Sequence, residues 1–139
     1  MALLLANFAL AAFHCGLIWT IQVVHYPLLR RVPAEDFPAY HAAHTRAITW
    51  IVAPTMTSEL VLALWLAHRD RDLDSRVVWA AALVVIVWAA TIVFQVPQHA
   101  RLARGRDEAT LRALVRTNLI RTAAWTARAA LLGALLLER

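Results

Sequence analysis

The stretch VVWAAALVVIVWAATIVFQV, residues 77–96, contains no charged side chain and is long enough to cross a bilayer as one helix. A membrane-spanning helix needs about 20 mostly apolar residues. Three further windows share this character, and 61% of the 139 residues are hydrophobic. We therefore expect an all-α, polytopic membrane four-helix bundle that forms a single transmembrane domain over residues 1–139, with spans at about 2–25, 45–67, 77–97 and 118–137.

The arginines predict how the bundle lies in the membrane. All fourteen Lys and Arg residues are arginine, and arginine-rich flanks stay in the cytoplasm. The first and third connectors with their flanks carry nine of them, against four on the opposite side. We expect a multi-pass protein of a bacterial-type inner (plasma) membrane, with both termini outside. These flanks also explain the sequence pI of about 11 without a nucleic-acid partner. The nine are Arg30, Arg31, Arg46, Arg101, Arg104, Arg106, Arg112, Arg116 and Arg121, and the four are Arg69, Arg71, Arg76 and Arg139.

The polar residues inside each window recur at helical spacing. Positions 3, 4, 7 or 11 apart lie on one face of a helix. Each window keeps its polar groups on one such face, which predicts a bundle with a hydrated or ligand-bearing centre. The four sets are His14, Gln22 and His25; His41, His44, Thr55 and Glu59; Trp88, Thr91, Gln95 and His99; and Asn118, Arg121, Trp125 and Arg128.

Depth divides these polar residues into two layers. At 1.5 Å per residue, His14, Glu59 and Arg128 lie about 15–18 Å from the cytoplasmic ends of their helices. Since isolated charges are costly there, Glu59 is expected to pair with Arg128, with His14 as the third member. Two interpretations of the Glu59–Arg128 pair stay open: it has a functional role, or it is only a structural ion pair. The second layer, nearer the cytoplasm, comprises Gln22, His25, His44, Gln95, His99, Asn118 and Arg121.

Two stretches of the chain resemble one another. TIQVVHYPLL (20–29) and VFQVPQHARL (93–102) both combine Gln-Val with a proline and a histidine. Each is followed by an arginine four residues before a tryptophan, and the offset is 73 to 75 residues. This pattern indicates either a duplicated two-helix hairpin or a chance match. In a duplication, Gln22 and Gln95 would give matching walls to one polar chamber; the alternative is that they only hydrogen-bond neighbouring helices together.

The histidines offer a choice of chemistry. Imidazole binds zinc, copper and iron, and His41 and His44 are one helical turn apart. The candidate metal ligands are His25, His41, His44 and His99, of which His25 and His99 could also be paired axial ligands of a haem. Cofactor-free chemistry is the alternative, with a histidine or Glu59 as general base for an acidic aromatic substrate. A simpler interpretation is that these histidines contact only water or lipid headgroups.

The run QVPQHARLARGRDEATLRALVRTNLIRTAAWTAR, residues 95–128, resembles the anthrone-oxygenase-like family of membrane proteins. That family has a Val-Pro motif closing its third span, here Val96-Pro97, and an Asn-x-x-Arg-Thr motif opening its fourth, here Asn118 to Thr122. The family is expected to carry Asn where this chain has Gln95. The resemblance implies a four-span fold and an oxygenase-like oxidoreductase, since named members oxidise polyketide anthrones.

Two functions follow as hypotheses. The first is a membrane oxidoreductase acting on a hydrophobic small molecule that enters from the lipid. In it, His25, His44 and His99 are ligand or acid–base groups, and Asn118 and Arg121 orient an oxyanion. The second is a non-catalytic binding, transport or accessory protein, and Ala-rich helix faces would also suit a homodimer. In both, the substrate-binding or intramembrane polar residues are His14, Gln22, Glu59, Gln95, Trp125 and Arg128.

Overall fold

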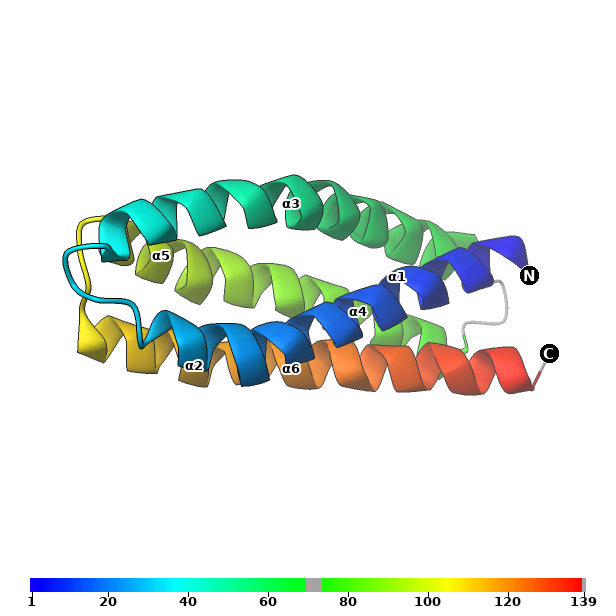
Figure 1. Ribbon diagram of the computed structural model, residues 1–139. Coiled ribbons are helices and arrows are strands. Elements are labelled where there is room, and N and C mark those ends of the chain that lie inside the picture. The colour runs from blue at the N-terminus through cyan, green and yellow to red at the C-terminus, as the bar shows by residue number, and fades with distance from the viewer. Residues whose placement is uncertain (70–73, 139) are drawn as a thin grey trace.

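The computed structural model describes residues 1–69 and 74–138, so Arg71 and Arg139 of the arginine count lie outside the described residues. It confirms the four-helix bundle (Figure 1). The four helical segments, each long and apolar enough to span a membrane, are Ala2–Leu29, Phe37–Arg69, Ser75–Leu102 and Glu108–Leu137. The first consists of α1 (Ala2–Thr20), η1 (Ile21–His25) and α2 (Tyr26–Leu29), and the second is α3 (Phe37–Arg69). The third consists of α4 (Ser75–Ala90), η2 (Thr91–Gln95) and α5 (Val96–Leu102), and the fourth is α6 (Glu108–Leu137).

Both termini lie at one end of the bundle, called the terminal end below (Figure 1). The connectors 30–36 and 103–107 lie at the other, the connector end. Helix α6 packs along both α1 and α4, whereas α3 packs against α1 and α4 from the other side. One buried cluster around Tyr26, Phe37 and Trp125 fills the connector half, and another around Leu4 and Leu132 fills the terminal half.

The outer surface of the bundle is apolar. Many large apolar residues are more than half exposed, among them Trp50, Val61, Trp79, Ile92 and Val93. Exposed apolar surface of this extent is unfavourable in water and favourable against lipid chains. Together with the four spans, it makes this chain an integral membrane protein.

The helices begin further out than hydropathy predicts at the connector end. Helix α3 starts at Phe37 and α6 at Glu108, well before the apolar windows that begin at about 45 and 118. Asp107 caps α6 by accepting hydrogen bonds from the backbone N–H groups of Ala109 (3.2 Å) and Thr110 (3.0 Å). Just before it, Gly105 has φ 147°, a conformation that favours glycine. Arg106 then ties the two connectors together by donating to the carbonyls of Val32 (2.7 Å) and Arg30 (2.8 Å).

The two similar stretches share a local distortion. In both η1 and η2 the helix widens to a π-helix directly before an X-Pro step: Tyr26 N–H donates to Ile21 O, and Val96 N–H to Thr91 O. A proline lacks the N–H and crowds the carbonyl four residues earlier, which favours such a break in the regular pattern. The matching prolines, Pro27 and Pro97, are 70 positions apart.

This register corrects the one expected from the repeat. With an offset of 70, His25 matches Gln95 and not His99. The second halves differ as well. Arg46 and Trp50 of α3 are exposed, whereas Arg121 and Trp125 of α6 are buried. The reason is packing: α6 packs closely against both α1 and α4, while α3 packs less closely against η2 and α5, which it meets through His41 and His99.

Candidate functional site

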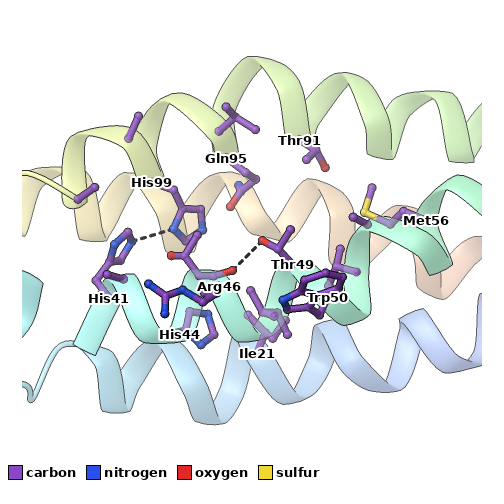
Figure 2. A pocket seen from close by; sticks show the side chains of 18 of the residues that line it. Ile21, His41, His44, Arg46, Thr49, Trp50, Met56, Thr91, Gln95 and His99 are labelled. Atoms are coloured by element: carbon purple, nitrogen blue, oxygen red, sulfur yellow. Dashed lines mark hydrogen bonds between the residues drawn. The ribbon is translucent and has the colours of Figure 1, made fainter. Parts of the chain in front are cut away.

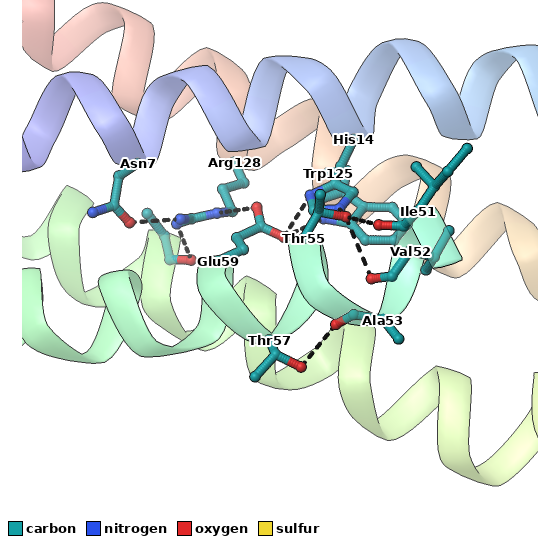
Figure 3. Close-up of polar contacts among 11 residues, drawn as sticks. Asn7, His14, Ile51, Val52, Ala53, Thr55, Thr57, Glu59, Trp125 and Arg128 are labelled. Atoms are coloured by element: carbon teal, nitrogen blue, oxygen red, sulfur yellow. Dashed lines mark hydrogen bonds and ion pairs between the residues drawn. The ribbon is translucent and has the colours of Figure 1, made fainter. Parts of the chain in front are cut away.

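A closed polar network lies within the bundle between α1, α3 and α6 (Figure 3). At its centre is Glu59 of α3, only 1% exposed. Its Oε1 accepts from Arg128 Nε at 2.9 Å, and its Oε2 lies 2.9 Å from both His14 Nδ1 and Trp125 Nε1. We call this network the deep cluster; its members are Asn7, His14, Thr55, Glu59, Trp125 and Arg128.

The predicted pairing of Glu59 with Arg128, with His14 as third member, is confirmed. Arg128 also donates to the Ala80 carbonyl at 2.9 Å and to Asn7 Oδ1 at 2.8 Å, so all three of its nitrogens are used. His14 completes the network through Nε2, 3.0 Å from Thr55 Oγ1. Buried charges are tolerated when they are paired and hydrogen-bonded in this way.

Asn7 is the member that the sequence reading missed. It is buried, and its amide nitrogen donates to the carbonyls of Leu3 and Leu62, both at 3.0 Å. It lies seven residues before His14 and hence on the same face of α1. Extending the polar stripe by two turns would have found it.

A cavity of about 850 Å³ lies toward the connector end, between α3 on one side and η2 and α5 on the other (Figure 2). Its walls are mainly apolar, including Ile48, Val52 and Met56 of α3. Exposed residues of both sides also line it: Trp50 is 80% exposed and Val96 57%. The cavity is therefore open to the surroundings of the bundle between these two helices.

The four candidate metal ligands gather at the connector end as two pairs. His41 Nε2 lies 3.1 Å from His99 Nδ1, which joins α3 to α5 (Figure 2). His25 and His44 stack with their ring centroids 3.8 Å apart, which joins η1 to α3. In the described part of the chain, no three or more His, Cys, Asp or Glu side chains form a group that could hold a metal ion. His41, His44 and His99 line the cavity, and His25 lies behind His44. Metal or haem binding by these residues stays a prediction.

Arg121 is the buried cation of the cavity. It is 8% exposed, and among the described residues its only hydrogen bond runs from Nη1 to Thr91 Oγ1 at 3.3 Å. Its guanidinium carbon lies 5.4 Å from the centroid of the Trp125 ring. Over residues 1–69 and 74–138, no carboxylate lies within ion-pair distance of it, and its Nε has no hydrogen-bond partner. A buried, uncompensated charge of this kind is costly unless something else supplies the counter-charge.

The predicted second layer divides into two parts. Gln95, His44, His99 and Arg121 line the cavity, whereas Gln22 and Asn118 do not. Asn118 Nδ2 donates to Gln22 Oε1 at 2.7 Å, and Gln22 Nε2 donates to the Val115 carbonyl at 3.3 Å. These two amides thus hydrogen-bond η1 to α6, and the prediction of a single chamber with matching glutamine walls was wrong, since Gln95 lines the cavity and Gln22 does not. Asn118 is outside the cavity lining and so is not placed to orient an oxyanion there beside Arg121.

Gln95 combines both of the expected roles. It lines the cavity, and it also accepts from Tyr26 Oη at 3.3 Å and donates to Thr117 Oγ1 at 3.0 Å. Tyr26 itself is a cavity residue that sequence reasoning missed, because its aromatic ring reads as core. Two further lining atoms, Trp88 Nε1 and Thr45 Oγ1, are buried with no hydrogen-bond partner among the described residues. The cavity thus offers two free polar atoms in addition to Arg121.

No family model matches this chain, and no curated protein or solved structure matches it. Its function is therefore inferred from the geometry of the cavity and the deep cluster.

Proposed function

We propose that this membrane protein binds, in its cavity, a largely apolar small molecule that carries one acidic group. The observation that carries the proposal is Arg121, a buried guanidinium on the cavity wall with no carboxylate partner among the described residues. The acidic group would lie against this guanidinium, and the apolar body would contact Ile48, Val52 and Met56.

A comparison of charges supports an anionic ligand. Two arginines are buried in the bundle, Arg121 and Arg128, but Glu59 is the one buried carboxylate in the described ranges. Glu59 is already used by Arg128, His14 and Trp125. A ligand carboxylate, phenolate or enolate would give Arg121 the charge-assisted hydrogen bonds that it lacks.

The exposed rim supports entry from the lipid. The cavity lining includes Trp50 and Val96, whose exposed side chains lie on the outer, lipid-facing surface of α3 and α5. A molecule dissolved in the bilayer could enter sideways between these helices without crossing the charged connectors. Apolar walls with a few fixed polar groups are typical of small-molecule sites.

Binding of a matched pair of probes tests the proposal. Anthracene-9-carboxylate and the neutral anthracene-9-carboxamide would be titrated into protein in nanodiscs of zwitterionic lipid, with energy transfer from tryptophan as the signal. We expect the acid to bind at least about tenfold more tightly, a difference of about 1.4 kcal/mol. Arg121→Gln should abolish this preference. Arg116→Gln, on an exposed position of the same helix, is the control and should keep it. Equal binding of acid and amide by the unaltered protein would contradict the proposal.

A second candidate, oxygenase-like oxidation, is favoured by the imidazoles of His41 and His99 beside Arg121 in one cavity. Their 3.1 Å contact offers a base, and Arg121 offers a counter-charge for the anion that proton removal creates. The reaction would convert an activated CH₂ group and O₂ to a carbonyl group and water. The base takes the first proton, and O₂ is the oxidant that supplies both oxygen atoms.

Oxygen uptake separates the two candidates. With an anthrone as substrate, an oxygenase should consume one O₂ for each quinone formed, and the absorbance of the quinone follows its formation. His99→Ala should slow turnover by about 10²-fold or more, the contribution of a general base. Acid-selective binding without oxygen uptake would leave a non-catalytic binding protein as the function.

A further inference from the structure

Trp125 links the deep cluster to Arg121. Its indole N–H donates to Glu59 Oε2 at 2.9 Å, and the His14 ring stacks on it with centroids 4.8 Å apart and planes 17° apart. Residues 121 and 125 are four apart on α6, so their side chains are neighbours on one helix face. The guanidinium carbon of Arg121 lies 5.4 Å from the indole centroid, within the range of a cation–π contact.

Few other contacts fix the position of the Arg121 guanidinium. Its one hydrogen bond to the residues that the structure describes, to Thr91 Oγ1, is long at 3.3 Å. Arginine has several rotatable bonds, and a single long hydrogen bond does little to fix the orientation of its head group. The indole ring is the aromatic surface against which this cation rests.

The indole is held much more tightly than the guanidinium. It is 2% exposed, stacked on His14, and hydrogen-bonded to a carboxylate that is itself fixed by Arg128 at 2.9 Å. Hydrogen bonds to a charged acceptor are shorter and stronger than those between neutral groups. The ring cannot turn without breaking this bond.

We propose that Trp125 is a positioning residue: Glu59, through the indole N–H, fixes the ring plane that holds Arg121 toward the cavity. The inference rests on the proposed function, in which Arg121 receives the acidic group of the ligand. It also gives the deep cluster a function beyond its own stability, since a receptor fixed before binding loses less entropy when the ligand arrives.

The test uses Trp125→Phe, which keeps an aromatic ring but removes the N–H donor to Glu59. Trp19→Phe is the control, because Trp19 Nε1 also donates to a neighbouring helix, from α1 to Thr126 Oγ1 of α6 at 3.0 Å, on the exposed side. Both variants lose one interhelical indole N–H hydrogen bond to or from α6, but only Trp125 reaches the Glu59 carboxylate of α3. The readout is the ratio of the affinities for anthracene-9-carboxylate and anthracene-9-carboxamide in nanodiscs, together with the melting temperature.

We expect Trp125→Phe to lower the acid-to-amide ratio about three- to tenfold, through weaker binding of the acid alone. Trp19→Phe should leave the ratio unchanged. An unchanged ratio in Trp125→Phe would overturn the positioning role, while loss of the ratio in Arg121→Gln would still support the anion site. If the unaltered protein shows no preference for the acid, the anion site and the positioning role both fail. Should Trp125→Phe not fold, Trp125→Tyr, which also lacks the indole N–H, takes its place with the same expected ratio.

Discussion

At the scale of single residues, Glu59 holds three groups from two helices. His14 of α1 and both Trp125 and Arg128 of α6 approach one carboxylate of α3 within 2.9 Å. In lipid, the hydrophobic effect does not distinguish helix–helix contact from helix–lipid contact, so such polar contacts help to determine which helix faces meet. Glu59 therefore contributes to the specificity of helix packing as well as to its stability.

Replacing one partner of this pair should cost more than replacing both. Arg128→Gln leaves the Glu59 carboxylate buried without its cation, and Glu59→Gln leaves the guanidinium unpaired. Each single change is expected to lower the free energy of unfolding by about 3–5 kcal/mol. The double variant holds two neutral amides and should be more stable than either single variant. Unfolding in mixed detergent micelles measures the free energy of unfolding of each variant. If the losses of the two single variants added up in the double variant, the expectation would be contradicted.

The residues of the site were predictable to the extent that depth and helical face decide them. Glu59, Arg128 and His14 share a level and point inward. Since a charge in a dry interior needs a partner, the pairing of Glu59 with Arg128 was predictable. Gln22 and Asn118 also point inward. Helical periodicity predicts which face of a helix a residue lies on, but not which residue of a neighbouring helix it contacts. Their mutual hydrogen bond of 2.7 Å depends on how closely η1 approaches α6, and the sequence pattern of one helix does not contain that distance.

At the scale of helices, the Gln22–Asn118 bond should contribute little energy despite its short length. Measured coupling energies for hydrogen bonds between membrane helices average about 0.6 kcal/mol and reach about 1.7. A double-mutant cycle with Gln22→Ala and Asn118→Ala is expected to fall in this range. A coupling near zero would show that the two amides find other partners when separated.

The start of α6 should respond to pH through Asp107. The hydroxyl and backbone N–H of Thr110, and then the N–H of Ala109, donate to this carboxylate and hold its pKa below the usual range. A lowered pKa means that the ionised cap stabilises the fold above about pH 3.9, the ordinary value, and that this contribution is lost as the pH falls through the lowered pKa. Asp107→Asn can still accept these bonds but does not titrate. Its melting temperature in detergent should therefore change less between neutral and acidic pH than that of the unaltered protein. Equal acid sensitivity of the two proteins would refute this role.

Hydropathy predicted the existence of all four helices but not their ends or their irregular turns. The connector-side ends of α3 and α6 contain polar and charged residues. A search for continuous apolar residues therefore begins each span later than the helix itself begins. The π-helical turns before Pro27 and Pro97 were visible in the sequence only as a repeated proline. Nothing in composition shows that this proline widens the preceding turn rather than ending the helix.

At the scale of the whole molecule, the asymmetry between α3 and α6 creates the cavity. Helix α6 packs closely between α1 and α4, whereas α3 packs only loosely against η2 and α5, which it meets through His41 and His99. Under the proposed function, the divergence of the second halves, with Arg46 and Trp50 exposed but Arg121 and Trp125 buried, is thus the feature that gives the bundle a binding site.

The arginine distribution also predicts which compartment the connector end faces, and with it the side from which a proton could reach the histidine pairs. Arg30, Arg31, Arg104 and Arg106 all lie in the connectors 30–36 and 103–107, and such flanks stay in the cytoplasm. In a Cys15→Ser background, Ala34→Cys in the first connector and Ser75→Cys at the terminal end each introduce one exposed thiol. A membrane-impermeant maleimide should label Ser75→Cys in intact cells, and Ala34→Cys only after the membrane is opened. The reverse pattern would place the histidine pairs and the inner end of the cavity toward the outside. Labelling of both thiols in intact cells would indicate insertion in both directions, for which the imbalance of nine arginines to four gives no reason.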